Sequence, residues 1–294
     1  MRKIIIFFIC IFCVLNFKAQ NISLQELHFS NDGEFRIVVF ADCSLSDEKS
    51  EQTGFVLRTI EIENPQLVVF EGCTGNTETL KELLRKRNVG YVFVAKDDGR
   101  DMVVPVMSSD GNGVYRLLYF FDSYSYLKEK GSLPGITFNQ VSWYRQNSRM
   151  YADKNGGIPV AALAFMCLPL PEYCEAARVY GGKSSSKKGA MTFIGHQNTV
   201  VSSENVNSGL FTSMYECGDV RGIFCGHDAD NDFALVWKNI MLAYSRCSSV
   251  ARDDCGARVI VLKEGEDGFS TFVRLDTNEV TESCTFPSDF IMLK

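Results

Sequence analysis

The chain has 294 residues, of which 36 are acidic and 30 are basic, so its formal net charge is −6. An acidic chain is poorly suited to a nucleic-acid backbone, because such binding depends on Lys and Arg side chains that release counterions. The length accommodates one large α/β domain or two small ones, and no Pro- or Ser-rich linker and no internal repeat divides the sequence.

The first 20 residues are typical of a secretory signal peptide. Arg2 and Lys3 precede an apolar run from Ile4 to Leu15, and Ala19 offers a small residue for cleavage. The run is too short to span a bilayer. We therefore expect an exported protein, secreted or periplasmic, with no membrane span after cleavage. Its mature net charge would be −9, because the removed segment carries three basic residues and no acidic ones.

Residues 21–34 are expected to lead into a single domain over residues 35–294. The polar stretch 181–190, GGKSSSKKGA, is predicted to be one long loop within that domain. Nine cysteines follow the signal peptide, and an odd number cannot all pair in an oxidising compartment. At least one cysteine is therefore expected to remain a thiol, to bind metal or to bond to another chain.

The first half of the domain alternates strands with helices. Apolar runs over residues 35–41, 66–72 and 91–95 predict buried strands, and helical patterns fill residues 47–64 and 76–88 between them. Such an alternation predicts parallel strands joined by right-handed crossovers.

The second half is richer in strands. A strand over 113–122, a helix over 136–151, a buried strand over 159–170 and a helix around 206–216 come first. Five closely spaced strands then follow, over residues 220–226, 232–237, 240–245, 257–262 and 270–275. This change of pattern predicts a four-layer α/β/β/α sandwich, in which two mixed sheets are flanked by helices.

Five buried strands each end in a short polar turn, at residues 41–44, 71–76, 95–98, 166–173 and 226–230. Five such turns at one sheet edge resemble the calcineurin-like metallophosphoesterases, in particular the purple acid phosphatase-like branch. The most specific similarities lie in the sequence around these turns: LPLPEY at 168–173, SGLF at 208–211, CGDVRGIFCGHD at 217–228, NDF at 231–233, and LAYSR and GARVI further on. The resemblance runs from about Phe35 to the C-terminus.

The family's turns read D-x-H, G-D, G-N-H, a lone His and G-H-x-H. Together they hold two metals that clamp a phosphate and activate a hydroxide. Of the seven expected ligands, Asp42 and His227 survive in this sequence. The other five positions hold Ser44, Cys73, Ala95, Cys167 and Ala229, and Lys96 stands where the family has a histidine that resembles a general acid.

These replacements predict a loss of catalysis. Perturbing an outer-shell partner of a metal site already costs roughly 10- to 100-fold in affinity or activity, and five lost ligands should cost more. We assign no catalytic residue and regard Asp42, Lys96 and His227 as a relic site. The resemblance thus implies an inactive phosphoesterase fold with a degenerate dinuclear metal centre, kept as a binding or interaction protein of the cell envelope, with no cofactor expected.

An alternative is a rewired site for one metal. Cys73, Cys167 and His227 occupy positions that would share one metal in the family, and two thiolates with an imidazole could hold zinc. Such a protein would be an active phosphomonoester or phosphodiester hydrolase. Cys73 and Cys167 could instead fill space as small apolar residues, which we favour, or pair with each other as a disulfide.

Lys96 has two interpretations. It could offset the charge of Asp42 and of the acids near His227, since an unpaired buried carboxylate is costly, and we favour this structural role. It could also bind a small anionic ligand as a point charge. The partner is therefore expected to be an envelope protein or a small anion.

Overall fold

The structure is a computed structural model that describes residues 22–23, 26–94, 101–123, 135–180, 183–187, 190–203 and 206–292. The predicted signal peptide over 1–20 and the candidate residue Lys96 lie outside the described residues.

Three parallel strands begin the fold. Strands β3 (Glu34–Ala41), β5 (Leu67–Glu71) and β7 (Gly90–Val94) lie side by side, and helices α1 (Glu51–Glu63) and α2 (Glu78–Lys86) connect them. The strands are apolar on both faces because each face is covered, which is why they read as continuous hydrophobic runs. The predicted parallel half is confirmed.

The first sheet is completed by antiparallel strands from the C-terminus. Strand β16 (Gly256–Lys263) pairs with β3, and β17 (Phe269–Leu275) and β18 (Val280–Phe286) follow outward. Strand β1 (Ile22–Ser23) pairs with β7 at the opposite edge. The order within the described chain is β1-β7-β5-β3-β16-β17-β18, a mixed sheet.

The second sheet is built around parallel strands β9 (Val114–Phe121), β10 (Ala162–Met166), β13 (Val220–Cys225) and β15 (Ile240–Tyr244). Strands β8 (Met102–Met107) and β2 (Leu27–His28) extend one side, and β14 (Ala234–Trp237), β12 (Ala190–His196) and β11 (Lys183–Lys187) extend the other. Helices α4 (Phe138–Lys154), α5 (Pro171–Tyr180) and α6 (Leu210–Cys217) belong to this half of the molecule.

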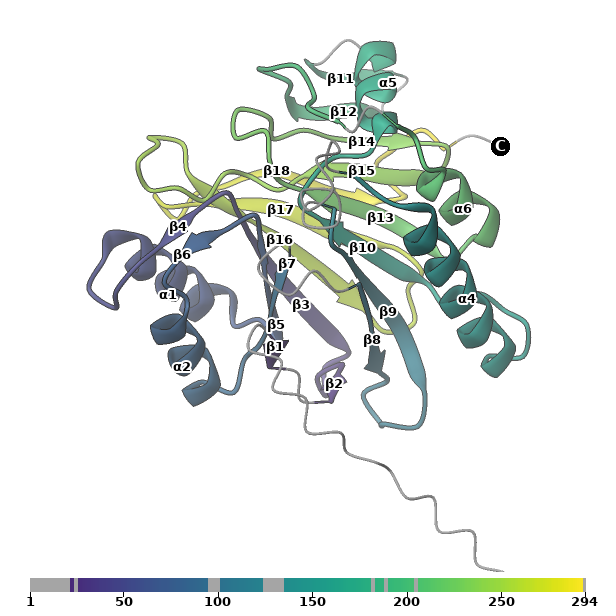
Figure 1. The fold of residues 1–294 in the computed structure, drawn as a ribbon, viewed down its shortest axis with the longest axis horizontal. Coiled ribbons are helices and arrows are strands. Elements are labelled where there is room, and N and C mark those ends of the chain that lie inside the picture. Colours follow the sequence, from purple (N-terminus) through teal and green to yellow (C-terminus); the bar gives the residue numbers. More distant parts are fainter. Residues whose placement is uncertain are drawn as a thin grey trace, which may run out of the picture.

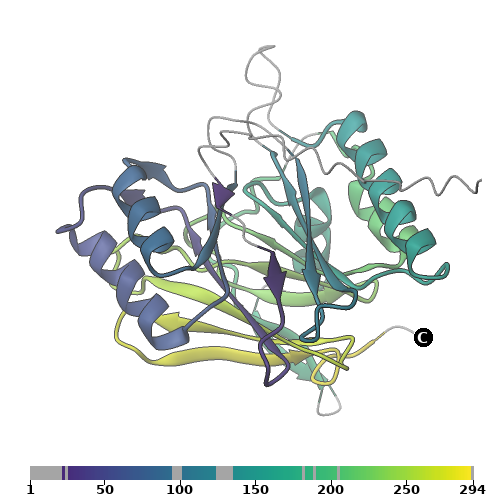
Figure 2. The ribbon, with the colours of Figure 1, turned by 90° about the horizontal axis from the view of Figure 1, so that it is seen from below.

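Figures 1 and 2 show helices and sheets arranged in layers, and three hydrophobic cores lie between these layers. One core lies between α1, α2 and the first sheet and includes Phe40, Phe55 and Phe70. A second, with Val39 and Phe165, lies between the two sheets, and a third packs the second sheet against its helices. The four-layer α/β/β/α sandwich predicted from the sequence is confirmed.

One sequence prediction is wrong in part. The stretch 181–190 was expected to be a loop, but residues 183–187 form β11, which pairs antiparallel with β12 at the edge of the second sheet. An edge strand bonds through its backbone on one side only, so a polar sequence such as KSSSK can form one without an apolar pattern. The rest of the interval lies outside the described residues, apart from Ala190, which starts β12.

Candidate functional site

The carboxyl ends of strands from both sheets meet at one edge. Asp42 follows β3 and Gly72 follows β5 in the first sheet, while Cys167 follows β10 and His227 comes soon after β13 in the second. A Cβ atom placed on Gly72 would lie 3.0 Å from both Asp42 Oδ1 and Cys167 Sγ. The structure therefore brings the Asp42 carboxyl, the Cys167 thiol and the Gly72 backbone together.

The turn that carries His227 approaches the same carboxyl. A Cβ atom on Gly226 would lie 3.2 Å from Asp42 Oδ2, and the His227 backbone N–H donates a hydrogen bond to the Asp42 carboxylate. Asp42 and His227 both have a positive φ, 54° and 77°, a conformation uncommon outside glycine that is held only where the surroundings impose it. The His227 side chain itself is exposed.

The Asp42 carboxyl is less acidic than an ordinary aspartate. Burial raises its pKa to about 6, the bond from the His227 backbone opposes the shift, and the Asp228 carboxylate adds to it. Asp228 is itself buried and accepts from the Tyr244 hydroxyl at 2.6 Å and the Ser202 backbone at 2.9 Å. The site edge thus gathers negative charge.

Glu71, the last residue of β5, is a member of this acidic group that the sequence reasoning missed. Its side chain is fully buried, and within the described residues neither carboxylate oxygen has a hydrogen-bond partner. Burial raises the pKa of Glu71 well above its usual range, Asp42 raises it further, and Ser245 and Arg258 lower it in part. The sequence signal that could have indicated Glu71 is a single acidic residue at the end of the otherwise apolar strand LVVFE.

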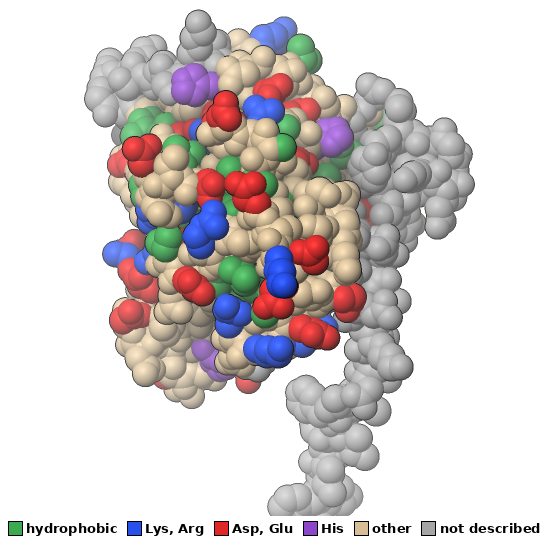
Figure 3. Space-filling model, turned by 90° about the vertical axis from the view of Figure 1, so that its left-hand side faces the viewer, with side chains coloured by type: hydrophobic (Ala, Val, Ile, Leu, Met, Phe, Trp, Pro, Cys, Tyr) green, Lys and Arg blue, Asp and Glu red, His purple; other side chains and the backbone are tan. Residues whose placement is uncertain are grey.

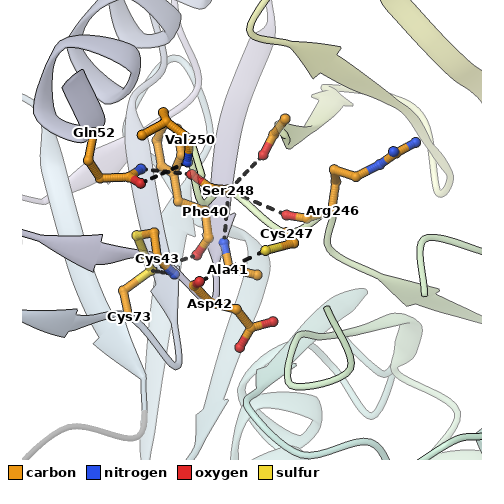
Figure 4. Close-up of a disulfide and its surroundings, with 11 residues drawn as sticks. Phe40, Ala41, Asp42, Cys43, Gln52, Cys73, Arg246, Cys247, Ser248 and Val250 are labelled. Atoms are coloured by element: carbon orange, nitrogen blue, oxygen red, sulfur yellow. Dashed lines mark hydrogen bonds between the residues drawn. A yellow bond between two sulfur atoms is a disulfide. The ribbon is translucent and has the colours of Figure 1, made fainter. Parts of the chain in front are cut away.

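Cys73 does not face Cys167, because it is bonded to Cys43 (Figure 4). The two Cα atoms are 4.6 Å apart, within the range of disulfides, and both side chains lie in the core beneath α1 and α2. The expectations that Cys73 is a packed free thiol or the disulfide partner of Cys167 are corrected. Its role as a metal ligand stays a prediction. The cause is topological, since Cys43 and Cys73 follow adjacent parallel strands by equal numbers of residues.

Cys167 is a free, buried thiol. Burial raises its pKa, and the carboxylates of Asp42, Glu71, Asp122 and Asp228 raise it further. A metal is held by thiolates, which this environment disfavours. Over the described ranges, no group of three or more His, Cys, Asp or Glu side chains is arranged to hold a metal ion.

The two kinds of cysteine should differ in reactivity. We expect Cys167 to be alkylated by iodoacetamide as soon as the protein is unfolded in denaturant, because only burial protects it. Cys43 and Cys73 should stay unmodified in the same denatured sample until a reductant is added, as peptide mass spectrometry would show. Alkylation of Cys73 without reductant would contradict the assigned disulfide.

A compact ion cluster lies between the sheets near the site. Arg258 is fully buried, and its guanidinium donates to Glu282 Oε2 at 3.1 Å and to the Tyr244 carbonyl at 2.7 Å. Arg246 pairs with Glu282 at 2.8 Å and with Asp232 at 2.7 Å. Two cations here face two acids with enclosed side chains, so the cluster adds little net charge to the site.

Comparison with known proteins agrees with this geometry. No family model matches the sequence. The chain is 23% identical to "Probable inactive purple acid phosphatase 14" of Arabidopsis thaliana, over 77% of this chain and 73% of that protein. It is 24% identical to "Probable inactive purple acid phosphatase 29" of the same plant, over 75% and 73%.

Among solved structures, a dimetal phosphatase from Danio rerio superposes with a TM-score of 0.51 at 11% identity, covering 85% of this chain and 98% of that one. That likeness shows a shared fold. The protein has the fold of that phosphatase, and its sequence is similar to those of the two plant proteins named as probable inactive purple acid phosphatases. The similarity agrees with the resemblance to the purple acid phosphatase-like branch, and most metal-ligand positions implied by that resemblance hold other residues here.

Proposed function

We propose that this protein is a catalytically inactive member of the family that works as a binding protein of the cell envelope. The observation that carries the proposal is the Cys43–Cys73 bond. By the family resemblance, Cys73 stands at the position of the carboxylate that bridges the two metals, and its sulfur is engaged elsewhere. A dinuclear mechanism has no bridging ligand in this chain.

The remaining site residues support the same proposal. Asp42 carries a raised pKa, Cys167 is held as a thiol, and Ser44 and Ala229 replace ligand positions. We propose that no metal or other cofactor is needed. The alternative of one zinc held by Cys73, Cys167 and His227 would require the Cys43–Cys73 bond to be broken first.

Export is also part of the proposal. It is supported by the apolar N-terminal run and by a buried disulfide, since disulfides persist mainly in oxidising compartments. In the described part of the chain, no helix combines the length and the apolar character that crossing a bilayer requires. The partner would be an envelope protein or a small anion. Figure 3 shows one face of the molecule, on which acidic and basic side chains are interspersed.

The proposal predicts no phosphoesterase turnover. Purified protein supplied with manganese, zinc or iron should hydrolyse an aryl phosphate and an aryl phosphodiester no faster than a variant carrying Asp42→Asn and His227→Ala. The comparison with this variant removes the contribution of contaminating phosphatases. Metal-dependent turnover that the double substitution abolishes would favour the alternative, an active hydrolase with a rewired mononuclear site.

A further inference from the structure

A very small sheet covers the turns that carry Asp42 and Gly72. Strands β4 (Ser44–Leu45) and β6 (Thr74–Gly75) pair in parallel over two residues each. The Thr74 N–H donates to the Cys43 carbonyl and the Asn76 N–H to the Leu45 carbonyl, both at 2.9 Å. Ser44, Thr74, Gly75 and Asn76 are exposed, so water competes for these bonds. Two such hydrogen bonds hold a segment weakly, and its buried contacts are those of Cys43, Leu45 and Cys73 with the core beneath α1 and α2.

The residues behind this small sheet oppose its closure. Asp42, in the first of the two turns, has a φ of 54°, a conformation that few residues other than glycine adopt without strain. Glu71 is fully buried and, within the described residues, lacks a hydrogen-bond partner at both oxygens. The strained Asp42 backbone and the buried Glu71 carboxyl, which would gain water on opening, both favour separation of the two turns.

Neighbouring segments have anchors of their own. The Gln52 side chain of α1 donates to the Ser248 carbonyl at 2.7 Å and accepts from the Val250 N–H at 3.1 Å. The Ala41 N–H at the end of β3 donates to Ser248 Oγ at 3.1 Å, as Figure 4 shows. Helix α1 and strand β3 are thus fixed independently of the small sheet, which has one covalent link, between Cys43 and Cys73.

We propose that the Cys43–Cys73 disulfide is a redox-sensitive staple, and that its reduction by a dithiol opens residues 43–50 and 72–77 while the sandwich stays folded. The dithiol supplies two electrons and two protons: the sulfur–sulfur bond breaks, Cys43 and Cys73 become thiols, and the dithiol becomes a disulfide. The inference does not rest on the proposed function.

The neighbouring thiols of Cys247 and Cys167 do not reduce the Cys43–Cys73 disulfide in place of the external dithiol. Cys247 Sγ lies 3.9 Å from the Asp42 carbonyl and Cys167 Sγ lies near Gly72, but burial raises the pKa of both thiols. Protonated thiols attack disulfides poorly. Cys43 and Cys73 are 2% and 3% exposed, so an external dithiol must reach them during a transient opening.

Hydrogen exchange with and without dithiothreitol tests the proposal on the full chain. In the reduced protein, the amides of Thr74 and Asn76 should exchange faster, by a factor on the order of ten or more. Amides of β16 should stay protected over the same interval. A Cys43→Ser and Cys73→Ser double variant should exchange like the reduced protein and not respond to dithiothreitol, whereas Cys174→Ser, which removes an exposed free thiol, should behave like wild type.

Two results would overturn the proposal. In the first, two additional thiols per chain titrate after reduction, yet Thr74 and Asn76 keep the protection of the oxidised protein. In the second, β16 loses protection together with them, which would make the bond a staple of the whole fold. Because the reduced wild-type protein is measured directly, a double variant that fails to fold leaves the test intact.

Discussion

Replacing Arg258 by alanine is expected to lower the free energy of unfolding by about 3 to 5 kcal/mol. The guanidinium is fully buried between the sheets, where it pairs with Glu282 and donates to the Tyr244 and Asp232 carbonyls. Its removal leaves the Tyr244 and Asp232 carbonyls and Oε2 of Glu282 without this donor, and it opens a cavity. Urea unfolding followed by circular dichroism measures the change.

The control is an arginine at the surface. Arg221 pairs with Asp267 at 2.8 Å, but the two side chains are 26% and 67% exposed. Solvent screens such a pair, so Arg221→Ala should cost less than about 1 kcal/mol. Equal effects of the two substitutions would show that the buried cluster is not what stabilises the contact between the sheets.

Stability is expected to fall as the pH rises from about 4 through 6, which is the opposite of ordinary acid denaturation. The pKa of Asp42 is raised to about 6 in the folded protein, and burial raises that of Glu71 as well. These carboxyls ionise at lower pH in the unfolded chain than in the folded protein. Their contribution to folding stability is therefore fully present below their unfolded-state pKa values and is lost as the pH rises through their folded-state pKa values. For Asp42 the loss is about 1 to 3 kcal/mol.

Glu71→Gln should reduce this dependence. The amide cannot ionise, so the variant is expected to be more stable than wild type at pH 8 and to lose less stability between pH 6 and pH 8. Glu175→Gln changes an exposed glutamate of α5 and should leave the wild-type pH profile unaltered. An unchanged profile in Glu71→Gln would mean that this carboxyl is already ionised in the folded protein.

The architecture was predictable because its central strands are covered on both faces. Val38 and Val39 of β3 face different cores, so both faces of the strand are apolar. An unbroken apolar run of this length is typical of a strand buried on both faces. Strands β11 and β18 were missed for the converse reason. Both lie at sheet edges and are polar, as in KSSSK and VTESCTF, so no apolar period marks them.

The site was predictable as far as topology determines it. Asp42 and Cys167 lie close together, and the backbone of the turn with His227 contacts Asp42, because the carboxyl ends of parallel strands from both sheets lie at the same edge of the sandwich. The Cys43–Cys73 bond was not predicted, since it depends on which face of the first sheet Cys73 points to, and a single-residue shift reverses that face. Glu71 escaped notice because it ends a strand that was assigned to the core.

Metal content is the measurement that tests the central claim most directly. Protein purified without chelator and then dialysed against manganese, zinc and iron should retain well under one metal ion per chain by mass spectrometry of the elements, because the chain offers neither a bridging carboxylate nor a free Cys73 thiolate. The same value in the Asp42→Asn and His227→Ala variant would agree with a dismantled centre. Retention of one or more metal ions per chain, lost in that variant, would contradict the account.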